Sequence, residues 1–349
     1  MKIAVLFSGG VDSSVVLAML KRQGHNVTAF YLKIWLEDDM AFMGDCPWEV
    51  DLQYARAVCQ RCDVPLEIIS LQTEYHNRVV SYALAELRAG RTPSPDIFCN
   101  QRIKFGAFYD CVNNQFDRVA TGHYASIQQD GEIVRLIKGV DPVKDQSYFL
   151  SHLSQAQLSR AHFPLGQYTK TQVRELAQTY DLPTQNRKDS QGICFLGKIK
   201  YNEFVQFNLG EQEGDIVDRD NGRVLGRHRG HWFHTIGQRQ GLGLSGGPWY
   251  VVEKDVDQNI VFVVHGDELV QQARRQFDTG QLHWISKSPE ETALQLKLRH
   301  GPVMIPCHIK PLGQDQCRVT LDEPDTGIAP GQFAVFYRGQ ECLGAGTIL

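Results

Sequence analysis

The chain begins with an unbroken apolar run, Ile3 to Phe7, of the kind that a buried parallel strand uses. A polar, glycine-containing stretch follows at residues 8–14, and six apolar positions at residues 15–20 then indicate a helix that stops at Gly24. Ser13 and Ser14 are the residues expected to cap the start of that helix. The pattern predicts a strand, a tight turn and a helix.

Strand-like and helix-like segments alternate over the next hundred residues. The expected strands are 27–35, 65–71 and 118–121, and the expected helices are 49–61, 74–89 and 100–112. This order predicts a parallel sheet covered on both faces, with ligands at the carboxyl ends of its strands. Asp130-Gly131 predicts a hairpin, and residues 169–180 are the last expected helix.

Beyond residue 240 the helical patterns stop. Short β-branched or alternating runs occur at residues 249–252, 260–264, 293–298, 304–309, 317–321 and 333–337, and they predict a small antiparallel β-barrel. We therefore expect an α/β protein in three parts. These are an N-terminal parallel-sheet domain (1–198), a small central α+β domain (199–270) and a C-terminal antiparallel β-barrel (271–349).

The first candidate for chemistry is the string Ser-Gly-Gly-Val-Asp-Ser-Ser at residues 8–14. Gly9 and Gly10 let the backbone approach a phosphate, and the N-H groups and dipole of the following helix favour its charge. The string is not a Walker loop, because the glycine spacing differs and no lysine follows the second glycine. It resembles the pyrophosphate loop of the N-type ATP pyrophosphatases, which cleave ATP between the α and β phosphates. A plain strand-to-helix turn is the alternative.

Composition adds little to this picture, since 42% hydrophobic and 22% charged residues are ordinary for a globular chain of 349 residues. The net charge of −4 does not favour nucleic-acid binding. However, residues 135–239 carry 15 Lys and Arg against 11 Asp and Glu, so either a basic face or an unevenly charged surface is possible. No apolar stretch approaches the length that spans a bilayer, so we expect a cytoplasmic protein that does not enter membranes.

Nine cysteines at irregular spacings argue against a secreted disulfide framework and leave room for reactive thiols. Cys99 follows a loop stiffened by two prolines, and we expect it at the start of a helix, where the dipole favours a thiolate. Cys194 lies in a polar stretch, residues 188–195, that reads as a loop. Taken alone, each cysteine is better explained as a small buried apolar residue. The pair Cys59 and Cys62 lies on an expected helix without a second pair, which indicates packing rather than zinc.

Seven segments taken together resemble the tRNA-specific 2-thiouridylase family. They run in the family's order at residues 8–14, 93–105, 122–125, 144–150, 163–166, 189–195 and 235–242, while the barrel matches more loosely. The resemblance implies an ATP pyrophosphatase domain of the adenine nucleotide alpha hydrolase-like type. It also implies an enzyme that adenylates the C2 oxygen of the wobble uridine of tRNA and replaces that oxygen with sulfur.

The resemblance also implies a role for each matching residue. Cys194 would carry a persulfide, Cys99 would attack it to release sulfur and leave a disulfide, and Asp96 would sit beside the target base. The implied ATP-binding residues are Leu6, Phe7, Ser8, Gly9, Gly10, Val11, Asp12, Ser13, Leu32 and Gly122. The implied tRNA-binding residues are Ser94, Pro95, Asp96, His123, Lys144, Asp145, Gln146, Arg299, His300 and Gln332, the last three by loose alignment. Ser94 stands where members usually carry Asn.

The implied cofactors are ATP and Mg2+, and the implied partners are tRNA and a sulfur-donor relay protein or cysteine desulfurase; we expect a monomer. Several alternatives stay open. Asp96, Cys99 and Cys194 are also a possible ligand set for an iron–sulfur cluster, and His123 is equally explained as a satisfied core histidine. An amide-forming ligase of the same superfamily would need neither cysteine. A non-catalytic tRNA-binding module is the third functional class, and the intact loop at residues 8–14 argues against it.

Overall fold

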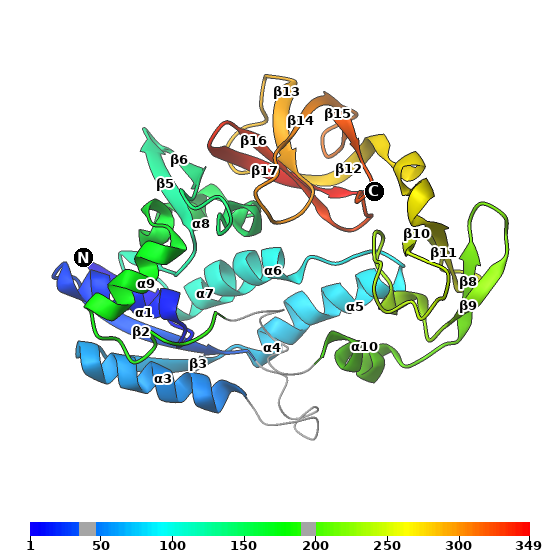
Figure 1. Ribbon diagram of the computed structural model, residues 1–349. Coiled ribbons are helices and arrows are strands. Elements are labelled where there is room, and N and C mark those ends of the chain that lie inside the picture. The colour runs from blue at the N-terminus through cyan, green and yellow to red at the C-terminus, as the bar shows by residue number, and fades with distance from the viewer. Residues whose placement is uncertain (35–46, 190–199) are drawn as a thin grey trace.

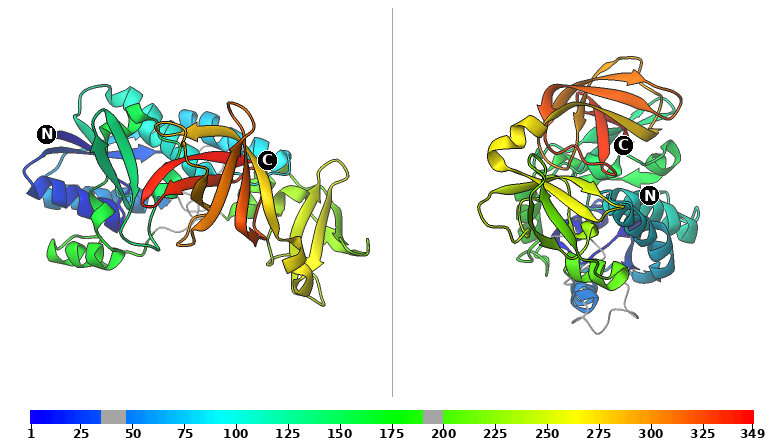
Figure 2. Two further views of the ribbon diagram at one scale, coloured as in Figure 1. Left: turned by 90° about the horizontal axis from the view of Figure 1, so that it is seen from above. Right: turned by 90° about the vertical axis from the view of Figure 1, so that its right-hand side faces the viewer.

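The computed structural model describes residues 1–34, 47–189 and 200–349, which form three parts (Figure 1). An N-terminal sheet with helices on both faces, a small central sheet and a C-terminal barrel account for most of the chain. Seen from above, the barrel lies between the N-terminal sheet and the central sheet (Figure 2). The predicted architecture, with a parallel sheet, a small central domain and an antiparallel barrel, is confirmed.

The N-terminal sheet is parallel throughout and has the order β3-β2-β1-β4-β7. Its strands are β1 (Lys2–Leu6), β2 (Asn26–Lys33), β3 (Leu66–Ser70), β4 (Arg118–Ala120) and β7 (Ala161–His162). The chain runs outward from β1 to β3 and returns to β4 on the other side of β1. The gap between the ends of β1 and β4 is therefore the topological switch point, where open α/β sheets bind ligands.

Alternation along β1 explains why this strand is buried on both faces. Ile3, Val5 and Phe7 pack against helices α1 (Val11–Arg22), α3 (Pro47–Cys62) and α9 (Lys170–Thr179). Ala4 and Leu6 point to the opposite face, where a second set of helices packs. Successive side chains of a strand point to opposite faces, so one continuous apolar run serves both layers.

Two long helices on that second face each contain a π-helical middle. The first combines α4 (Gln72–Tyr75), η2 (His76–Val80) and α5 (Ser81–Arg88), close to the expected 74–89. The second combines α6 (Pro95–Phe98), η3 (Cys99–Ala107) and α7 (Phe108–Val112). It begins five residues before the predicted start at residue 100, because Pro95 occupies its first turn, where its missing N-H costs nothing.

The central part holds a four-stranded sheet of order β10-β11-β8-β9, from β8 (Gly214–Asp218), β9 (Val224–His228), β10 (Trp249–Asp255) and β11 (Ile260–His265). Helix α10 (Tyr201–Leu209) precedes it and was not expected. The runs at 249–252 and 260–264 belong to this sheet, so assigning them to the barrel was wrong. Their antiparallel pairing, and the parallel pairing of β11 with β8, give them partners there.

The barrel closes through six antiparallel strands. They are β12 (Arg274–Trp284), β13 (Ala293–Lys297), β14 (Ile305–Pro311), β15 (Cys317–Asp325), β16 (Phe333–Arg338) and β17 (Glu341–Ile348), and β12 pairs with β17 to close the ring. The pattern missed β12, which is mostly polar, and β17, which contains Gly344 and Gly346. Gly344 has φ +146, and a Cβ there would lie 2.0 Å from the backbone oxygen of His283.

The predicted hairpin is present as β5 (Ala125–Asp130) and β6 (Ile133–Lys138). It also extends the barrel, since β6 pairs antiparallel with β17. Two further short helices, α8 (Gln155–Arg160) and α9, follow before residue 189. Within the described ranges, no helix is long and apolar enough to cross a membrane.

Candidate nucleotide and sulfur-transfer site

The turn between β1 and α1 is held by hydroxyl groups of its own serines. Helix α1 begins at Val11 with Gly10 as its N-cap, and so starts earlier than the capping by Ser13 and Ser14 that the pattern predicted. Instead, the Ser13 and Ser14 hydroxyls donate to the Gly10 carbonyl at 3.1 and 2.8 Å. The Ser8 N-H donates to Ser13 Oγ at 3.3 Å. These bonds leave the first N-H groups of α1 pointing out of the helix end, which suits an anion.

Gly9 is required by the shape of this turn. Its φ is +72, and a Cβ would lie 2.4 Å from the backbone oxygen of Asp51. The Gly9 carbonyl accepts a hydrogen bond of 2.6 Å from Arg187, whose guanidinium also pairs with Asp51 and lies over the Tyr54 ring. The loop at residues 8–14, the predicted phosphate loop, is thus held in place by α3 and by Arg187.

The predicted ATP-binding residues gather at one edge of the sheet. Residues 6–13 run from the last residue of β1 into the first turn of α1, Leu32 is near the end of β2, and Gly122 follows β4. A Cβ on Gly122 would lie 3.1 Å from the Ser13 nitrogen, so the chain after β4 touches the first turn of α1. Three neighbouring strand ends therefore meet at the switch point.

Asp12, in the first turn of α1, is held through one carboxylate oxygen. Its Oδ1 accepts from the Tyr124 hydroxyl at 2.8 Å and from Lys170 Nζ at 2.7 Å. Burial, together with the charge of Asp12, raises the pKa of Tyr124, so that the hydroxyl stays a donor. Across the described part of the chain, Asp12 Oδ2 has no hydrogen-bond partner. An oriented carboxylate whose side chain is 30% exposed, beside the predicted phosphate loop, suits Mg2+ bound to a nucleotide.

Asp189 lies at the centre of a cluster of cations next to Asp12. Lys144 and Lys170 contact its two oxygens at 2.8 Å each, and Arg174 contacts Oδ1 at 2.6 Å. Burial alone would raise the pKa of Asp189, but the hydrogen bonds from Lys144 and Lys170 outweigh it and lower that pKa to about 2. The carboxylate stays charged at neutral pH and ties three segments together.

Cys99 lies one turn inside its helix and not at its start. Pro95 and Asp96 occupy the first turn, and Cys99 is the first residue of η3, with 1% of its surface exposed. The dipole argument for a thiolate is therefore weaker than predicted, because the effect of the helix end fades within the first turn. Cys194, the other predicted sulfur residue, lies outside the described residues.

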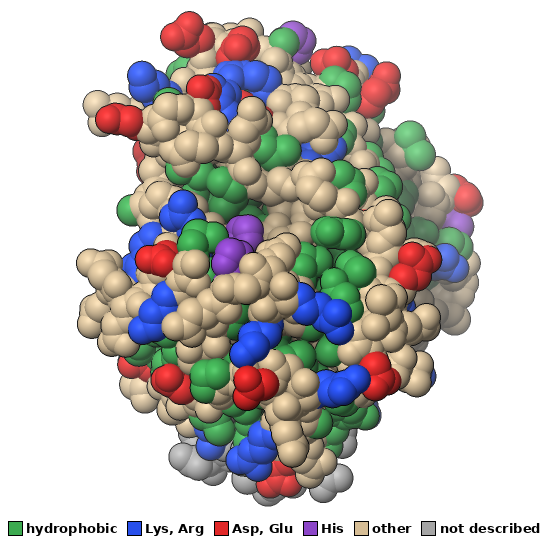
Figure 3. Space-filling view, turned by 90° about the vertical axis from the view of Figure 1, so that its left-hand side faces the viewer, with side chains coloured by type: hydrophobic (Ala, Val, Ile, Leu, Met, Phe, Trp, Pro, Cys, Tyr) green, Lys and Arg blue, Asp and Glu red, His purple; other side chains and the backbone are tan. Residues whose placement is uncertain are grey.

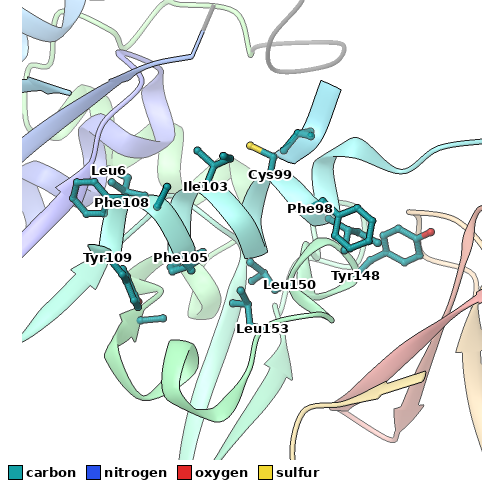
Figure 4. Packing of buried hydrophobic residues seen from close by; sticks show 14 of the residues in the cluster. Leu6, Phe98, Cys99, Ile103, Phe105, Phe108, Tyr109, Tyr148, Leu150 and Leu153 are labelled. Carbon is teal, nitrogen blue, oxygen red and sulfur yellow. The ribbon is translucent and has the colours of Figure 1, made fainter. Parts of the chain in front are cut away.

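Cys99 and Asp96 lie three positions apart on this helix, so their side chains are neighbours on its surface. Cys99 shares a core cluster with Leu6, at the end of β1, which links this helix to the phosphate loop (Figure 4). In that view the sulfur points to the side of the helix away from Leu150 and Leu153. The structure thus brings the predicted nucleotide and base-contacting segments into one region.

His123 is a buried core histidine. Its Nδ1 shares a hydrogen bond of 2.7 Å with the Thr121 hydroxyl, and the rings of Phe105 and Phe163 pack on it. Burial, helped by the charge of Lys104, lowers its pKa well below the usual value. The alternative explanation, a satisfied core residue, describes this side chain better than a direct contact with tRNA.

The segment Lys144-Asp145-Gln146 has one buried member. Asp145 is 1% exposed and forms an ion pair of 2.8 Å with the equally buried Lys297 of β13. Its other oxygen accepts from the Gly139 N-H and from the Ser147 N-H and hydroxyl. The Asp145 side chain is therefore buried, and its predicted contact with tRNA stays a prediction. Lys144 and Gln146 remain partly exposed.

Three residues of the barrel part, Arg299, His300 and Gln332, were predicted to bind tRNA, and they lie close to the N-terminal part. His300 Nε2 donates to the backbone carbonyl oxygen of Asp145 at 3.1 Å, and its ring stacks on Phe149 with the ring centroids 4.8 Å apart. A cavity of about 210 Å3 lies beside it, lined by residues 298–303 and Ile305. Arg299 is mostly exposed and pairs with Asp325. The turn before Gln332 reaches the loop that leads to Asp96, since the Thr92 N-H donates to the Pro330 oxygen.

On the face drawn in Figure 3, Lys and Arg side chains are interspersed with Asp and Glu. The described residues hold no group of three or more His, Cys, Asp or Glu that suits a metal ion. Cys59, on α3, is buried, and burial raises its pKa to about 12, which agrees with a packing role.

Family models match the three parts of this architecture. The tRNA methyl transferase HUP domain matches residues 1–198, the tRNA methyl transferase PRC-barrel domain matches 202–265, and the Aminomethyltransferase beta-barrel domain matches 274–348. A HUP domain carrying a phosphate loop at its switch point, followed by two β domains, is the class that fold and site define.

Named relatives narrow this class. The chain is 44% identical to the tRNA-specific 2-thiouridylase MnmA of Parabacteroides distasonis and 46% identical to the tRNA-specific 2-thiouridylase MnmA 1 of Bacteroides thetaiotaomicron. Each comparison covers 100% of this chain and 99% of the relative. Among solved structures, NMN synthetase from Francisella tularensis shares 18% identity over 60% of this chain and 77% of that one, with a TM-score of 0.35. The chain belongs to the tRNA-specific 2-thiouridylase family.

Sequence reasoning gave no role to several residues that build this site. Tyr124, Lys170, Arg174 and Arg187 all contact the phosphate loop or Asp189. Tyr124 and Arg187 lie next to segments that were singled out, so proximity in the sequence was a usable signal for them. Lys170 and Arg174 are ordinary cations of a surface helix in the sequence, and only the packing of α9 on α1 reveals them.

Proposed function

We propose that this chain is an ATP-dependent tRNA-specific 2-thiouridylase. It adenylates the C2 oxygen of the wobble uridine and then replaces that oxygen with sulfur. The observation that carries the proposal is the meeting of the phosphate loop with the helix of Asp96 and Cys99 in one core cluster, in a chain of this family. Boundaries near residues 198 and 271 separate the catalytic, central and barrel parts of the proposed enzyme.

Adenylation converts the uridine C2 oxygen from a poor leaving group into a good one. The uridine C2 oxygen attacks the α-phosphorus of ATP, the bond between the α-phosphorus and the bridging oxygen breaks, and pyrophosphate leaves. The N-H groups at the start of α1 and the nearby cations stabilise the charge that gathers on pyrophosphate. Asp12 Oδ2 would hold Mg2+, which neutralises part of the triphosphate charge when bound.

Sulfur transfer follows on the same base. Cys194 carries a persulfide delivered by a sulfur-donor protein, and the Cys99 thiolate attacks the Cys194 sulfur. The terminal sulfur leaves as hydrosulfide and displaces AMP from C2, and a disulfide joins the two cysteines. A thiol reductant then supplies two electrons to restore both thiols before the next turnover.

The target base has to leave the anticodon stack to reach Asp96. Arg299, His300, Gln332, Lys144, Gln146, Ser94 and Pro95 are the residues we propose to contact tRNA around it. The buried side chains of His123 and Asp145 hold in place the segments that carry these exposed residues. The cytoplasmic location and the monomeric state expected from the sequence complete the proposal.

A direct test mixes the protein with ATP, Mg2+, a persulfide donor, a thiol reductant and tRNA whose wobble base is uridine. Nucleoside analysis should detect 2-thiouridine, with pyrophosphate formed in step. The same tRNA with cytidine at the wobble position is the matched control and should give neither product. Formation of neither product from the uridine-containing tRNA would exclude the thiouridylase and favour the non-catalytic module.

A further inference from the structure

Lys170 bridges the phosphate loop to Asp189. Its Nζ lies 2.7 Å from Asp12 Oδ1 and 2.8 Å from Asp189 Oδ1, and its side chain is only 15% exposed. A lysine ammonium has three N-H donors. Two of them are used by these carboxylates, so one remains for a third acceptor.

The position of Lys170 is fixed at both ends of the side chain. It is the first residue of α9, after Thr169, which forms a capping box with Gln172. Its backbone N-H donates to Asp141 Oδ2 at 2.9 Å. Because α9 packs along α1, the ammonium is brought to the N-terminal turn of α1 and held there.

Asp189 holds that ammonium in place. It is itself bound by Lys144 and Arg174, so it does not depend on Lys170 alone for neutralisation. The five charged groups in direct contact, two carboxylates and three cations, therefore leave one positive charge beside the loop. A triphosphate approaching Asp12 without these cations would meet a negative carboxylate.

We propose that Lys170 directly contacts the β and γ phosphates of bound ATP, and that Asp189 is the positioning residue that holds it there. This rests on the proposed function and extends it to the departure of pyrophosphate. In the adenylation step the free N-H of Lys170 donates to an oxygen of the leaving pyrophosphate, and no proton is transferred. AMP lacks both phosphates and so has no contact with Lys170.

The test measures binding of inorganic pyrophosphate with Mg2+, and separately of AMP, by calorimetry to the full chain. Lys170→Met should weaken pyrophosphate binding at least tenfold and leave AMP binding within twofold, which also shows that the fold is intact. Lys170→Arg keeps the charge and should retain most of the affinity. Lys21→Met is the matched control, because Lys21 lies at the other end of α1 and pairs with exposed Asp63.

Asp189 is tested by a double-mutant cycle. Asp189→Asn should weaken pyrophosphate binding by itself, and adding it to Lys170→Met should cause no further loss beyond twofold. Pyrophosphate binding by Lys170→Met within twofold of the wild type would overturn the proposal, as would equal losses for Lys170→Met and Lys21→Met. These binding measurements need no turnover. A protein that makes no 2-thiouridine would contradict the proposed function, whereas the role of Lys170 is decided by pyrophosphate binding alone.

Discussion

Asp145 and Lys297 form an ion pair that is closed to solvent on both sides and joins the N-terminal part to the barrel. Lys144, the preceding residue, reaches Asp189 and through it the phosphate loop. Two consecutive residues therefore connect the barrel, which carries Arg299 and His300, to the residues proposed to bind ATP. The pair fixes how the two halves of the proposed tRNA surface face each other.

Removing one member of this ion pair should lower the stability of the fold. Asp145→Ala leaves the Lys297 ammonium buried without a counter-charge, and we expect a loss of about 3 to 5 kcal/mol in the free energy of unfolding. Urea denaturation measures it. Arg299→Ala, which breaks the exposed pair with Asp325, is the control and should cost about 1 kcal/mol or less.

The double variant Asp145→Ala with Lys297→Met separates charge from packing. It removes the uncompensated cation, so it should be more stable than Asp145→Ala alone. A double variant that is less stable than the single one would show that the ion pair is not the reason for the loss.

Gly9→Ala should disable the phosphate loop. The substitution combines a positive φ with a Cβ 2.4 Å from the Asp51 oxygen, so the turn has to move. We expect ATP affinity to fall by at least about tenfold, or about 1.4 kcal/mol. Equilibrium binding of ATP measures this.

Gly24→Ala provides the matched control for Gly9→Ala. Gly24 has φ +81, yet nothing lies within 4 Å of a Cβ there. It should cost about 1 to 2 kcal/mol of stability from backbone strain and leave ATP affinity unchanged. Equal ATP affinities for Gly9→Ala and the wild type would contradict the role of this turn.

The fold should lose stability in mild acid because of His152. Burial, with the charges of His283 and Arg102, lowers the pKa of His152 to about 3, while the unfolded chain titrates near pH 6.5. Between these values the unfolded state binds the extra proton, so stability falls as pH falls. From pH 7 to pH 5 this one group should account for a loss of about 2 kcal/mol.

His152→Phe should remove that share of the pH dependence. The ring at this position packs against Phe98 and Phe333, and His152 Nδ1 has no hydrogen-bond partner among the described residues, so an apolar ring is a suitable replacement. Urea unfolding of both proteins at pH 5 and pH 7 provides the comparison. Identical losses between the two pH values would assign the acid sensitivity to other groups.

Much of the fold follows from local pattern in the sequence. The run Ile3 to Phe7 predicts β1 because a strand between two helix layers is apolar on both faces, and the hairpin at Asp130-Gly131 is found where expected. The strands β12 and β17 were missed because polar residues and glycines carry no strand signal. Their pairing depends on contacts between segments about 65 residues apart, such as Thr279 with Ile348.

In the candidate site, too, local features can be predicted from the sequence and long-range contacts cannot. The phosphate loop is readable from seven consecutive residues, since its chemistry is local. The contacts of Lys170 with Asp12 and of Lys297 with Asp145 span more than 150 residues each, and no local pattern marks them. The sequence placed Asp145 among the residues that touch tRNA. Only the packing of the barrel shows that its carboxylate is enclosed.

The persulfide mechanism makes a prediction about metal content. Protein purified without oxygen should contain iron and acid-labile sulfide far below one equivalent per chain, because Cys99 and Cys194 act as redox partners in this account. Metal analysis and absorption spectroscopy measure both. Stoichiometric iron that is lost in Cys99→Ser would instead support the iron–sulfur cluster held by Asp96, Cys99 and Cys194.

The most direct test of the central claim is tRNA thiolation by Cys99→Ser and Cys194→Ser, with Cys111→Ser, an exposed cysteine on α7, as control. Each reaction contains ATP, Mg2+, tRNA and a persulfide donor, and both 2-thiouridine and pyrophosphate are quantified. We expect the first two variants to form pyrophosphate but only background 2-thiouridine, and Cys111→Ser to form both. Wild-type levels of 2-thiouridine from either Cys99→Ser or Cys194→Ser would contradict it.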